Sequence, residues 1–319
     1  MNEQNTDNNL DEMISIELEN DELVKLVTSN ADVASQYVVF QNSEDEYFAI
    51  NVAKVEELIE YKKLDITFTT KHTGAMKGTS KIRDNFVNIV CFDAWLEVES
   101  HTDQKSELAI LCNYANTRLA IVVKSVYGVV NMEPSNMYDD SGKDSKISYL
   151  YEIVVNSKKI LCKIFDSDQF LADVLPSKFE KENEITNAMA SHENVITKEI
   201  FIAEDSFLIQ NAIKRLLNKM NVTYQVFVNG KDLLDALEKK NLDTMALIIT
   251  DLEMPVMGGL ELLEICSKNT NYSKIPIIVN TNMSNTSIVH TAEKLGAKKV
   301  IKKLDLLRLQ EVILEFAKR

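Results

Sequence analysis

The sequence predicts two domains of different fold class, an all-β domain followed by an α/β domain built on a parallel sheet. Three observations support this prediction. The length of 319 residues is about twice that of a typical domain. Short strand-like runs with few helices fill residues 35–175. From residue 197 to residue 319, strand-like and helical patterns alternate five times, which is typical of a doubly wound sheet with helices on both faces.

Two further segments complete the expected organisation. Residues 1–34 form an acidic N-terminal extension, and residues 176–196 are a charged linker with few apolar positions. Within the extension, residues 11–27 have helical spacing of apolar residues, so this part is either an isolated amphipathic helix or a flexible lead-in. A helix docked on a domain is the alternative for the linker.

Composition excludes several classes of protein. The formal net charge of −14 and the pI near 4.9 argue against nucleic acid or anionic membrane as the main partner. No apolar run approaches the roughly 18 residues that a membrane span requires. The four cysteines are scattered without a C-x-x-C motif, so they are interpreted as buried thiols of a reducing compartment. A cytoplasmic location follows, without direct insertion into a membrane.

The first domain is predicted from its strand-like runs to be an all-β barrel or sandwich. Residues 52–59 are ambiguous, the polar residues 71–81 with two glycines are expected to be a loop, and residues 166–175 a helix capped by Asp166 or Ser167. The expected strands are 36–41, 46–51, 85–92, 107–112, 117–123, 126–130, 152–156 and 159–164. The aromatic residues at strand spacing, expected in the core, are Tyr37, Phe40, Phe48, Phe86, Phe92 and Trp95.

The second domain is organised around the run at 246–250, which is apolar on both faces and therefore typical of a central parallel strand. It stops at Asp251, and Pro255 with Gly258 and Gly259 marks the turn that follows. The other expected strands are 199–203, 224–228, 275–280 and 299–302, and the expected helices are 206–220, 230–239, 259–267, 286–295 and 306–318.

Polar residues follow four of these strands and are expected to meet at one edge of the sheet. Glu204 and Asp205 follow the first strand, and Asp251 follows the third. Three carboxylates this close would repel one another unless a hard cation lies between them, and Mg²⁺ prefers such oxygen ligands. Thr281 and Lys303 follow the fourth and fifth strands, where they could hold the oxygens of a phosphoryl group on Asp251.

This set of residues resembles the response-regulator receiver domain. The matching motifs are Glu204-Asp205, Asp251-Leu-Glu-Met-Pro-Val-Met-Gly-Gly259, Ile275-Pro-Ile-Ile-Val-Asn-Thr281 and Leu295-Gly-Ala-Lys-Lys-Val-Ile-Lys-Lys303. The resemblance implies a flavodoxin-like (βα)5 fold with strand order 2-1-3-4-5. It also implies that Asp251 accepts a phosphoryl group from a histidine kinase with the help of Thr281 and Lys303. Mg²⁺ would be held by Glu204, Asp205, Asp251 and the backbone carbonyl of Glu253.

Three positions depart from the receiver pattern. Leu304 stands where receivers usually have a proline, and Val300 stands where they usually have an aromatic residue. Asn282 replaces the small residue that usually follows the threonine. The chemistry of phosphorylation needs none of the three, but a switch that couples Thr281 to an aromatic side chain needs one of them. Asn282 lies at the mouth of the expected site, where it could alter the rate of autodephosphorylation.

The first domain resembles the CheW-type coupling domain, which implies two small β-barrels packed together. The motifs are Gln36-Tyr-Val-Val-Phe40, Glu46-Tyr-Phe-Ala-Ile50, Lys54-Val-Glu-Glu57, Gly78-Thr-Ser-Lys-Ile-Arg83 and Val87-Asn-Ile-Val-Cys-Phe-Asp93. The resemblance implies that Arg83 and Glu57 contact partners, and Val55 with Leu58 and Ile59 is a candidate apolar patch beside them. A solvated surface charge and apolar residues that close a barrel would give the same pattern.

The two domains in this order resemble the CheV chemotaxis coupling proteins. The resemblance implies an adaptor, not an enzyme, that links methyl-accepting chemoreceptors to the histidine kinase CheA at membrane-bound receptor arrays. Phosphorylation of Asp251 would modulate that coupling or make the receiver a phosphate sink. The alternatives are a passive scaffold with a vestigial receiver, a Mg²⁺-dependent phosphohydrolase, and a response regulator with a DNA-binding output; the acidic charge disfavours the last.

Overall fold

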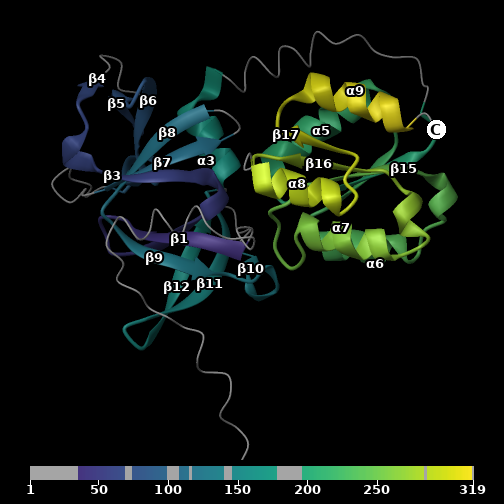
Figure 1. The fold of residues 1–319 in the computed structure, drawn as a ribbon, viewed down its shortest axis with the longest axis horizontal. Helices are drawn as coiled ribbons and strands as arrows, with labels where there is room; N and C mark the ends of the chain where they lie inside the picture. Colours follow the sequence, from purple (N-terminus) through teal and green to yellow (C-terminus); the bar gives the residue numbers. More distant parts are fainter. Residues whose placement is uncertain are drawn as a thin grey trace, which may run out of the picture.

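The structure is a computed structural model. It describes residues 35–68, 74–98, 108–114, 117–139, 146–177, 196–283 and 286–317. The expected N-terminal extension and most of the expected linker lie outside these ranges. Figure 1 shows a β-rich domain in purple to teal beside an α/β domain in green to yellow, as the sequence predicts.

The first domain is all-β, as expected, and contains two six-stranded sheets. The first sheet has the strand order β10-β11-β12-β2-β1-β9, and its neighbours are antiparallel except for β12 and β2. Its strands are β1 (Gln36–Gln41), β2 (Tyr47–Asn51), β9 (Ser125–Asn131), β10 (Tyr138–Asp139), β11 (Ile147–Val155) and β12 (Lys158–Phe165).

The second sheet has the order β3-β7-β8-β6-β5-β4, and only β6 and β8 run parallel. Its strands are β3 (Val55–Glu60), β4 (Ile66–Phe68), β5 (Met76–Ile82), β6 (Asn85–Cys91), β7 (Leu108–Tyr114) and β8 (Thr117–Val123). Short helices connect or follow the strands of this domain: η2 (Val52–Lys54), η3 (Tyr61–Lys63), α2 (Phe92–Trp95), η5 (Pro134–Asn136) and α3 (Ser167–Val174).

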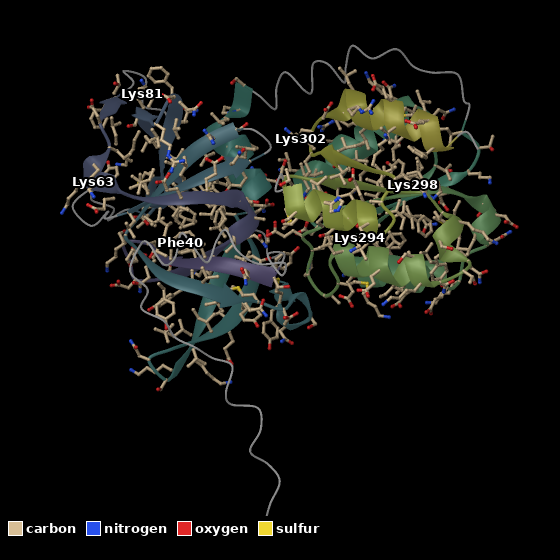
Figure 2. The ribbon with its side chains drawn as sticks, viewed as in Figure 1. Phe40, Lys63, Lys81, Lys294, Lys298 and Lys302 are labelled. Carbon is tan, nitrogen blue, oxygen red and sulfur yellow. The ribbon has the colours of Figure 1, made fainter. Side chains whose placement is uncertain are left out.

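Aromatic side chains fill the core of the first domain. Phe92 lies at its centre, with ring centroids 4.9 Å from both Phe40 and Phe48 and 5.1 Å from Phe165. Such edge-on pairs add to the stabilisation that burial provides. Figure 2 shows Phe40 inside the domain, whereas Lys63 and Lys81 lie at its periphery.

Two expectations for the segment of strands β5 and β6 were wrong. Residues 76–82 are not a loop but strand β5, in which two of the three buried positions are the small residues Gly78 and Ser80 and only the third, Ile82, is a large apolar residue. The apolar alternation expected of a strand is therefore weak in the sequence. Phe86 is not in the core: it pairs with Lys81 on the outward face and is 80% exposed. The neighbouring Val87 takes the inward position instead, because successive side chains of a strand point to opposite faces.

The second domain has the expected parallel sheet, with strand order β14-β13-β15-β16-β17. Helices α5 and α9 cover one face, and α6, α7 and α8 cover the other (Figure 1). The elements are β13 (Glu199–Ala203), α5 (Phe207–Lys219), β14 (Tyr224–Phe227), α6 (Gly230–Leu237), η6 (Leu242–Thr244), β15 (Met245–Thr250), α7 (Gly259–Lys268), η7 (Tyr272–Lys274), β16 (Ile277–Thr281), α8 (Thr286–Lys294), β17 (Lys299–Lys302) and α9 (Leu306–Ala317).

Candidate phosphoacceptor site

Parallel strands bring the predicted site residues together at one edge of the second sheet. Central strand β15 is buried at every position and ends at Thr250, directly before Asp251. Its neighbour β13 ends at Ala203, which is in register with Thr250, so Glu204 and Asp205 emerge beside Asp251. On the other side, Thr281 is the last residue of β16, and Lys303 directly follows β17.

Three carboxylates form a candidate cation site there. One ligand oxygen from each of Glu204, Asp205 and Asp251 lies within 4.8 Å of the other two. One Glu204 oxygen, Oε1, accepts hydrogen bonds from Lys303 Nζ at 2.8 Å and from the backbone nitrogen of Ser206 at 3.1 Å. The other, Oε2, is buried without a hydrogen-bond partner among the described residues. An orphaned carboxylate oxygen beside two further carboxylates fits an oxygen-preferring divalent cation such as Mg²⁺.

The electrostatics of the cluster point in the same direction. Burial raises the pKa of Asp205 to about 7, and Asp251 nearby adds to the effect. Burial also raises the pKa of Glu204 well above its usual value, although Lys303 acts in the opposite direction. Burial alone would lower the pKa of Lys303, but the surrounding carboxylates raise it well above its usual range. Lys303 thus does not offset the cost of burying Glu204 and Asp205 in their charged forms, and a bound cation would favour those forms.

Asp251 is held in a fixed orientation. Its Oδ1 accepts a hydrogen bond from the backbone nitrogen of Leu252 at 2.6 Å, and its Oδ2 lies 2.8 Å from Lys303 Nζ. The backbone of Asp251 packs closely against Gly259, where any Cβ would overlap the carbonyl oxygen of Asp251. This explains why a glycine begins helix α7. Thr281 is buried on the other side, and its hydroxyl oxygen accepts a hydrogen bond from the backbone nitrogen of Met283 at 3.3 Å.

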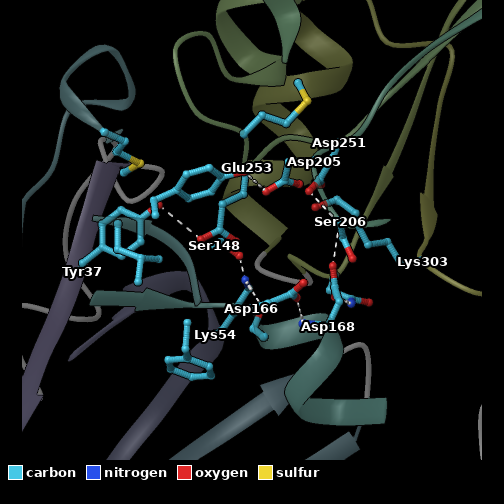
Figure 3. A pocket seen from close by; sticks show the side chains of 18 residues that line it. Tyr37, Lys54, Ser148, Asp166, Asp168, Asp205, Ser206, Asp251, Glu253 and Lys303 are labelled. Atoms are coloured by element: carbon cyan, nitrogen blue, oxygen red, sulfur yellow. Dashed lines mark hydrogen bonds and ion pairs between the residues drawn. The ribbon is translucent and has the colours of Figure 1, made fainter. Parts of the chain in front are cut away.

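The first domain covers this site, which the sequence did not indicate. Tyr149, on β11, donates a hydrogen bond to Asp205 Oδ2 at 2.5 Å. The carboxylate of Glu253 accepts hydrogen bonds from Lys54 and, at 3.2 Å, from the hydroxyl of Tyr37. Figure 3 shows Tyr37 and Lys54 of the β-rich domain on the side of Glu253 that faces that domain. Because Glu253 is predicted to offer its backbone carbonyl to a cation, its side chain remains available for these contacts.

Asp168 of helix α3 reaches furthest into the site. Its Oδ2 accepts a hydrogen bond from Lys303 Nζ at 2.8 Å, and its Oδ1 accepts one from Asn282 Nδ2 at 2.5 Å. Burial opposes the charged form of Asp168, but Lys303 and Lys54 outweigh it and lower its pKa. The sequence showed only that a short helix starts here with a cap at Asp166 or Ser167, and Asp166 is that cap.

The three departures from the receiver pattern have structural counterparts. Asn282 uses its longer side chain to bind Asp168 of the other domain. Leu304 has a φ of 68°, a left-handed conformation that proline, with φ fixed near −65°, cannot adopt. Val300 is half-buried and packs against the apolar cluster on the side of α8.

The candidate partner residues of the first domain form a separate group, of which Arg83 is the exposed member. Arg83, in the turn between β5 and β6, lies with its Nη2 2.8 Å from Glu57 Oε2, and the Arg83 side chain is 75% exposed. Leu58 and Ile59 are half-buried. Val55 is only 7% exposed and packs into the core, so the expectation that it lies on this surface was wrong.

Comparisons with known proteins agree with this architecture. The model of the CheW-like domain matches residues 36–174, and the model of the response regulator receiver domain matches residues 200–313. Chemotaxis protein CheV2 of Helicobacter pylori is 24% identical over 297 residues, covering 88% of this chain and 93% of that protein. Chemotaxis protein CheV1 of the same organism is 24% identical over 290 residues, covering 85% and 89%. The crystal structure of the scaffolding protein TtCheW from Thermoanaerobacter tengcongensis covers 41% of this chain and 88% of its own, with 13% identity and a TM-score of 0.36.

The chain is thus a signalling adaptor that joins a CheW-like domain to a response regulator receiver domain. These two domains, together with the similarity to the CheV proteins over most of the chain, support a CheV-type chemotaxis coupling protein. Within the described ranges, none of the helices combines the length and the apolar character that spanning a membrane requires.

Proposed function

We propose that the CheW-like domain links chemoreceptors to the histidine kinase CheA at receptor arrays, and that the receiver accepts a phosphoryl group from the kinase on Asp251. One observation supports the second part above all. Asp251 Oδ2 lies 2.8 Å from the buried ammonium of Lys303, with the carboxylate oxygens of Glu204 and Asp205 beside it. A passive scaffold would not need a buried, unbalanced group of charges, which costs folding free energy.

In the proposed reaction a carboxylate oxygen of Asp251 attacks the phosphorus atom of a phosphohistidine. The P–O bond forms as the P–N bond breaks, and the imidazole that leaves takes up a proton. Lys303 and the hydroxyl of Thr281 would donate hydrogen bonds to the phosphoryl oxygens. Receiver domains in general bind Mg²⁺; here Glu204, Asp205, Asp251 and the carbonyl of Glu253 would hold it, and it would neutralise the charge that gathers on the phosphoryl oxygens.

The phosphohydrolase alternative is less well supported. Such an enzyme would need a free carboxylic acid two residues after the nucleophile, and that position is Glu253. Its carboxylate is engaged by Lys54 and by the hydroxyl of Tyr37, both from the other domain. Modulation of the coupling is the favoured role of phosphorylation over a phosphate sink, because the two domains meet at the acceptor site itself.

The test is phosphoryl transfer from the purified, radiolabelled phosphorylated kinase to the full chain, with and without Mg²⁺. We expect label on the native chain only when Mg²⁺ is present and none on Asp251→Asn. Asp243→Asn is the matched control, because Asp243 is exposed in η6 before β15, at the opposite edge of the sheet. Equal labelling of native chain and Asp251→Asn would contradict the assignment of the acceptor. The decay of the label distinguishes a sink, where it is fast, from a modulator, where it is slow.

A further inference from the structure

The carboxylate of Asp168 is placed by a rigid element of the CheW-like domain. Asp166 caps α3, and its Oδ1 accepts hydrogen bonds at 2.9 Å from the backbone nitrogens of Asp168 and Gln169. A carboxylate in the first turn of a helix is also favoured by the helix dipole. Lys54 also holds this end of the helix, because its ammonium group donates a hydrogen bond to Ser167 Oγ at 2.7 Å. The Asp168 side chain is therefore presented to the receiver in one orientation.

Asp168 accepts one of the hydrogen bonds that Lys303 would otherwise donate to a phosphoryl group. An ammonium group has three hydrogens to donate. Lys303 Nζ has three carboxylate oxygens at 2.8 Å, one each from Asp168, Glu204 and Asp251. Two of these belong to the receiver, and only Asp168 belongs to the other domain. A phosphoryl oxygen on Asp251 can gain a hydrogen bond from Lys303 only when one of the three is displaced.

The space between the domains leads to the same conclusion. Both Asp251 and Lys303 have side chains that are at most 4% exposed. The cavity between the domains, lined by residues of both, has a volume of about 30 Å³, which is room for one or two water molecules. A phosphohistidine does not fit there. The arrangement described here is thus one in which the acceptor is covered.

We propose that Asp168 competes with the phosphoryl group for Lys303, so that the two domains are held together when Asp251 is unmodified and separate when it is phosphorylated. The inference rests on the proposed function and adds its regulation. A phosphoryl group adds a charge of about −1.5 to −2, and it would do so beside the buried carboxylate of Asp168. Repulsion and the loss of the Lys303 hydrogen bond therefore act together to release α3.

The competition works in both directions. If phosphorylation separates the domains, then any event that separates them must favour phosphorylation to the same extent. Only molecules whose domains are separated can be modified, so the observed rate is proportional to the fraction of such molecules. A partner that pulls the CheW-like domain away from the receiver would consequently increase the rate at which Asp251 is phosphorylated.

The first experiment measures phosphorylation of the full chain by a small donor, acetyl phosphate with Mg²⁺. Asp168→Asn keeps the shape of the side chain but removes its charge, and we expect modification to be about tenfold faster, because a charge-assisted hydrogen bond contributes at least that factor. Asn282→Ala removes the second contact from the receiver side and should act in the same direction by a smaller factor. Glu152→Gln is the control, since Glu152 pairs with Lys159 on the exposed surface of β11.

The second experiment measures the radius of gyration of the same proteins by small-angle X-ray scattering, with and without beryllofluoride and Mg²⁺. We expect beryllofluoride, a phosphoryl analogue, to increase the radius of the native chain and of Glu152→Gln. Asp168→Asn should have the larger radius from the start, with a native-like thermal melt to show that each domain is folded. The thermal melt and the second variant, Asn282→Ala, distinguish separation of two folded domains from unfolding.

The outcomes distinguish this inference from the proposed function. Equal rates for native chain and Asp168→Asn, with no change of radius on modification, would overturn the competition while leaving Asp251 as the acceptor. Absence of modification in every protein would overturn the proposed function, and the competition with it. Faster modification of Asp168→Asn together with an increased radius would support both.

Discussion

Lys303 and Arg83 both pair with carboxylates, but in opposite surroundings. Lys303 is 3% exposed and faces three carboxylates that are at most 8% exposed. Arg83 is 75% exposed and pairs, within the part of the chain that the structure describes, with Glu57. Buried charges persist only when they are paired, whereas exposed ion pairs contribute about 0–1 kcal/mol. A change at Lys303 should therefore affect stability, domain contact and chemistry together, but a change at Arg83 should affect recognition alone.

The largest effect is expected for Lys303→Ala. It leaves Asp168, Glu204 and Asp251 buried without their shared ammonium, and breaking a buried ion pair in this way costs about 3–5 kcal/mol. The unfolding free energy in urea should fall by an amount of that order. Mg²⁺ should restore more stability to this variant than to the native chain, because a cation among Glu204, Asp205 and Asp251 would replace part of the lost charge.

Lys302→Ala is the matched control for that comparison. Lys302 is the preceding lysine in the chain, and its side chain is half-buried at the end of β17. Its removal should change the unfolding free energy far less and leave the response to Mg²⁺ unaltered. Equal losses of unfolding free energy in the two variants would show that the ion pairs of Lys303 do not stabilise the fold more than an ordinary lysine does.

The sequence predicts the receiver and its site in detail for a physical reason. Parallel strands that are buried on both faces appear as continuous apolar runs, and each of them stops at a polar residue. Strand ends that share one edge must converge, so Asp251, Thr281 and Lys303 could be placed together without knowledge of the packing. The all-β character of the first domain was equally visible, whereas strand β5 was missed because two of its inward residues, Gly78 and Ser80, are small.

The contact between the domains could not be predicted in this way. Asp168, Tyr149 and Lys54 are ordinary polar residues in the sequence, and no spacing or motif relates them to the receiver residues they contact, which lie 56 to 199 positions further along the chain. Only the docking of the two folded domains brings them to the site. The one available signal was Asn282, a departure from the receiver pattern at the mouth of the site, which the structure explains by its hydrogen bond to Asp168.

A smaller effect is expected for Tyr149→Phe. The change removes the hydroxyl that donates to Asp205 Oδ2 at 2.5 Å and leaves the packing of the ring in place. A hydrogen bond to a charged group contributes about 1.5–3 kcal/mol. The arrangement in which the two domains are in contact should therefore be destabilised by up to that amount. Because an oxygen of Asp205 becomes free, Mg²⁺ should bind the full chain more tightly in an isothermal titration.

Tyr151→Phe provides the comparison on the same strand. Tyr151 lies two positions further along β11, packs against the core of the first sheet and does not line the cavity between the domains. It should bind Mg²⁺ like the native chain. Tighter binding by both variants, or by neither, would mean that the Tyr149 hydroxyl does not compete with the cation for Asp205.

The smallest effect on stability is expected for Arg83→Ala. The Arg83 side chain is 75% exposed although Glu57 is partly buried, so the unfolding free energy should change by about 1 kcal/mol or less. If this surface contacts receptors or kinase as we propose, the variant should nevertheless lose co-sedimentation with receptor-containing membranes and CheA. Lys63→Ala, which breaks the exposed ion pair to Glu60 in the same domain, should keep it. Retained binding by Arg83→Ala would show that Arg83 is not part of the partner surface. Loss of binding in both variants would indicate a general effect of charge. Loss in Arg83→Ala alone, at unchanged stability, would complete the contrast with Lys303.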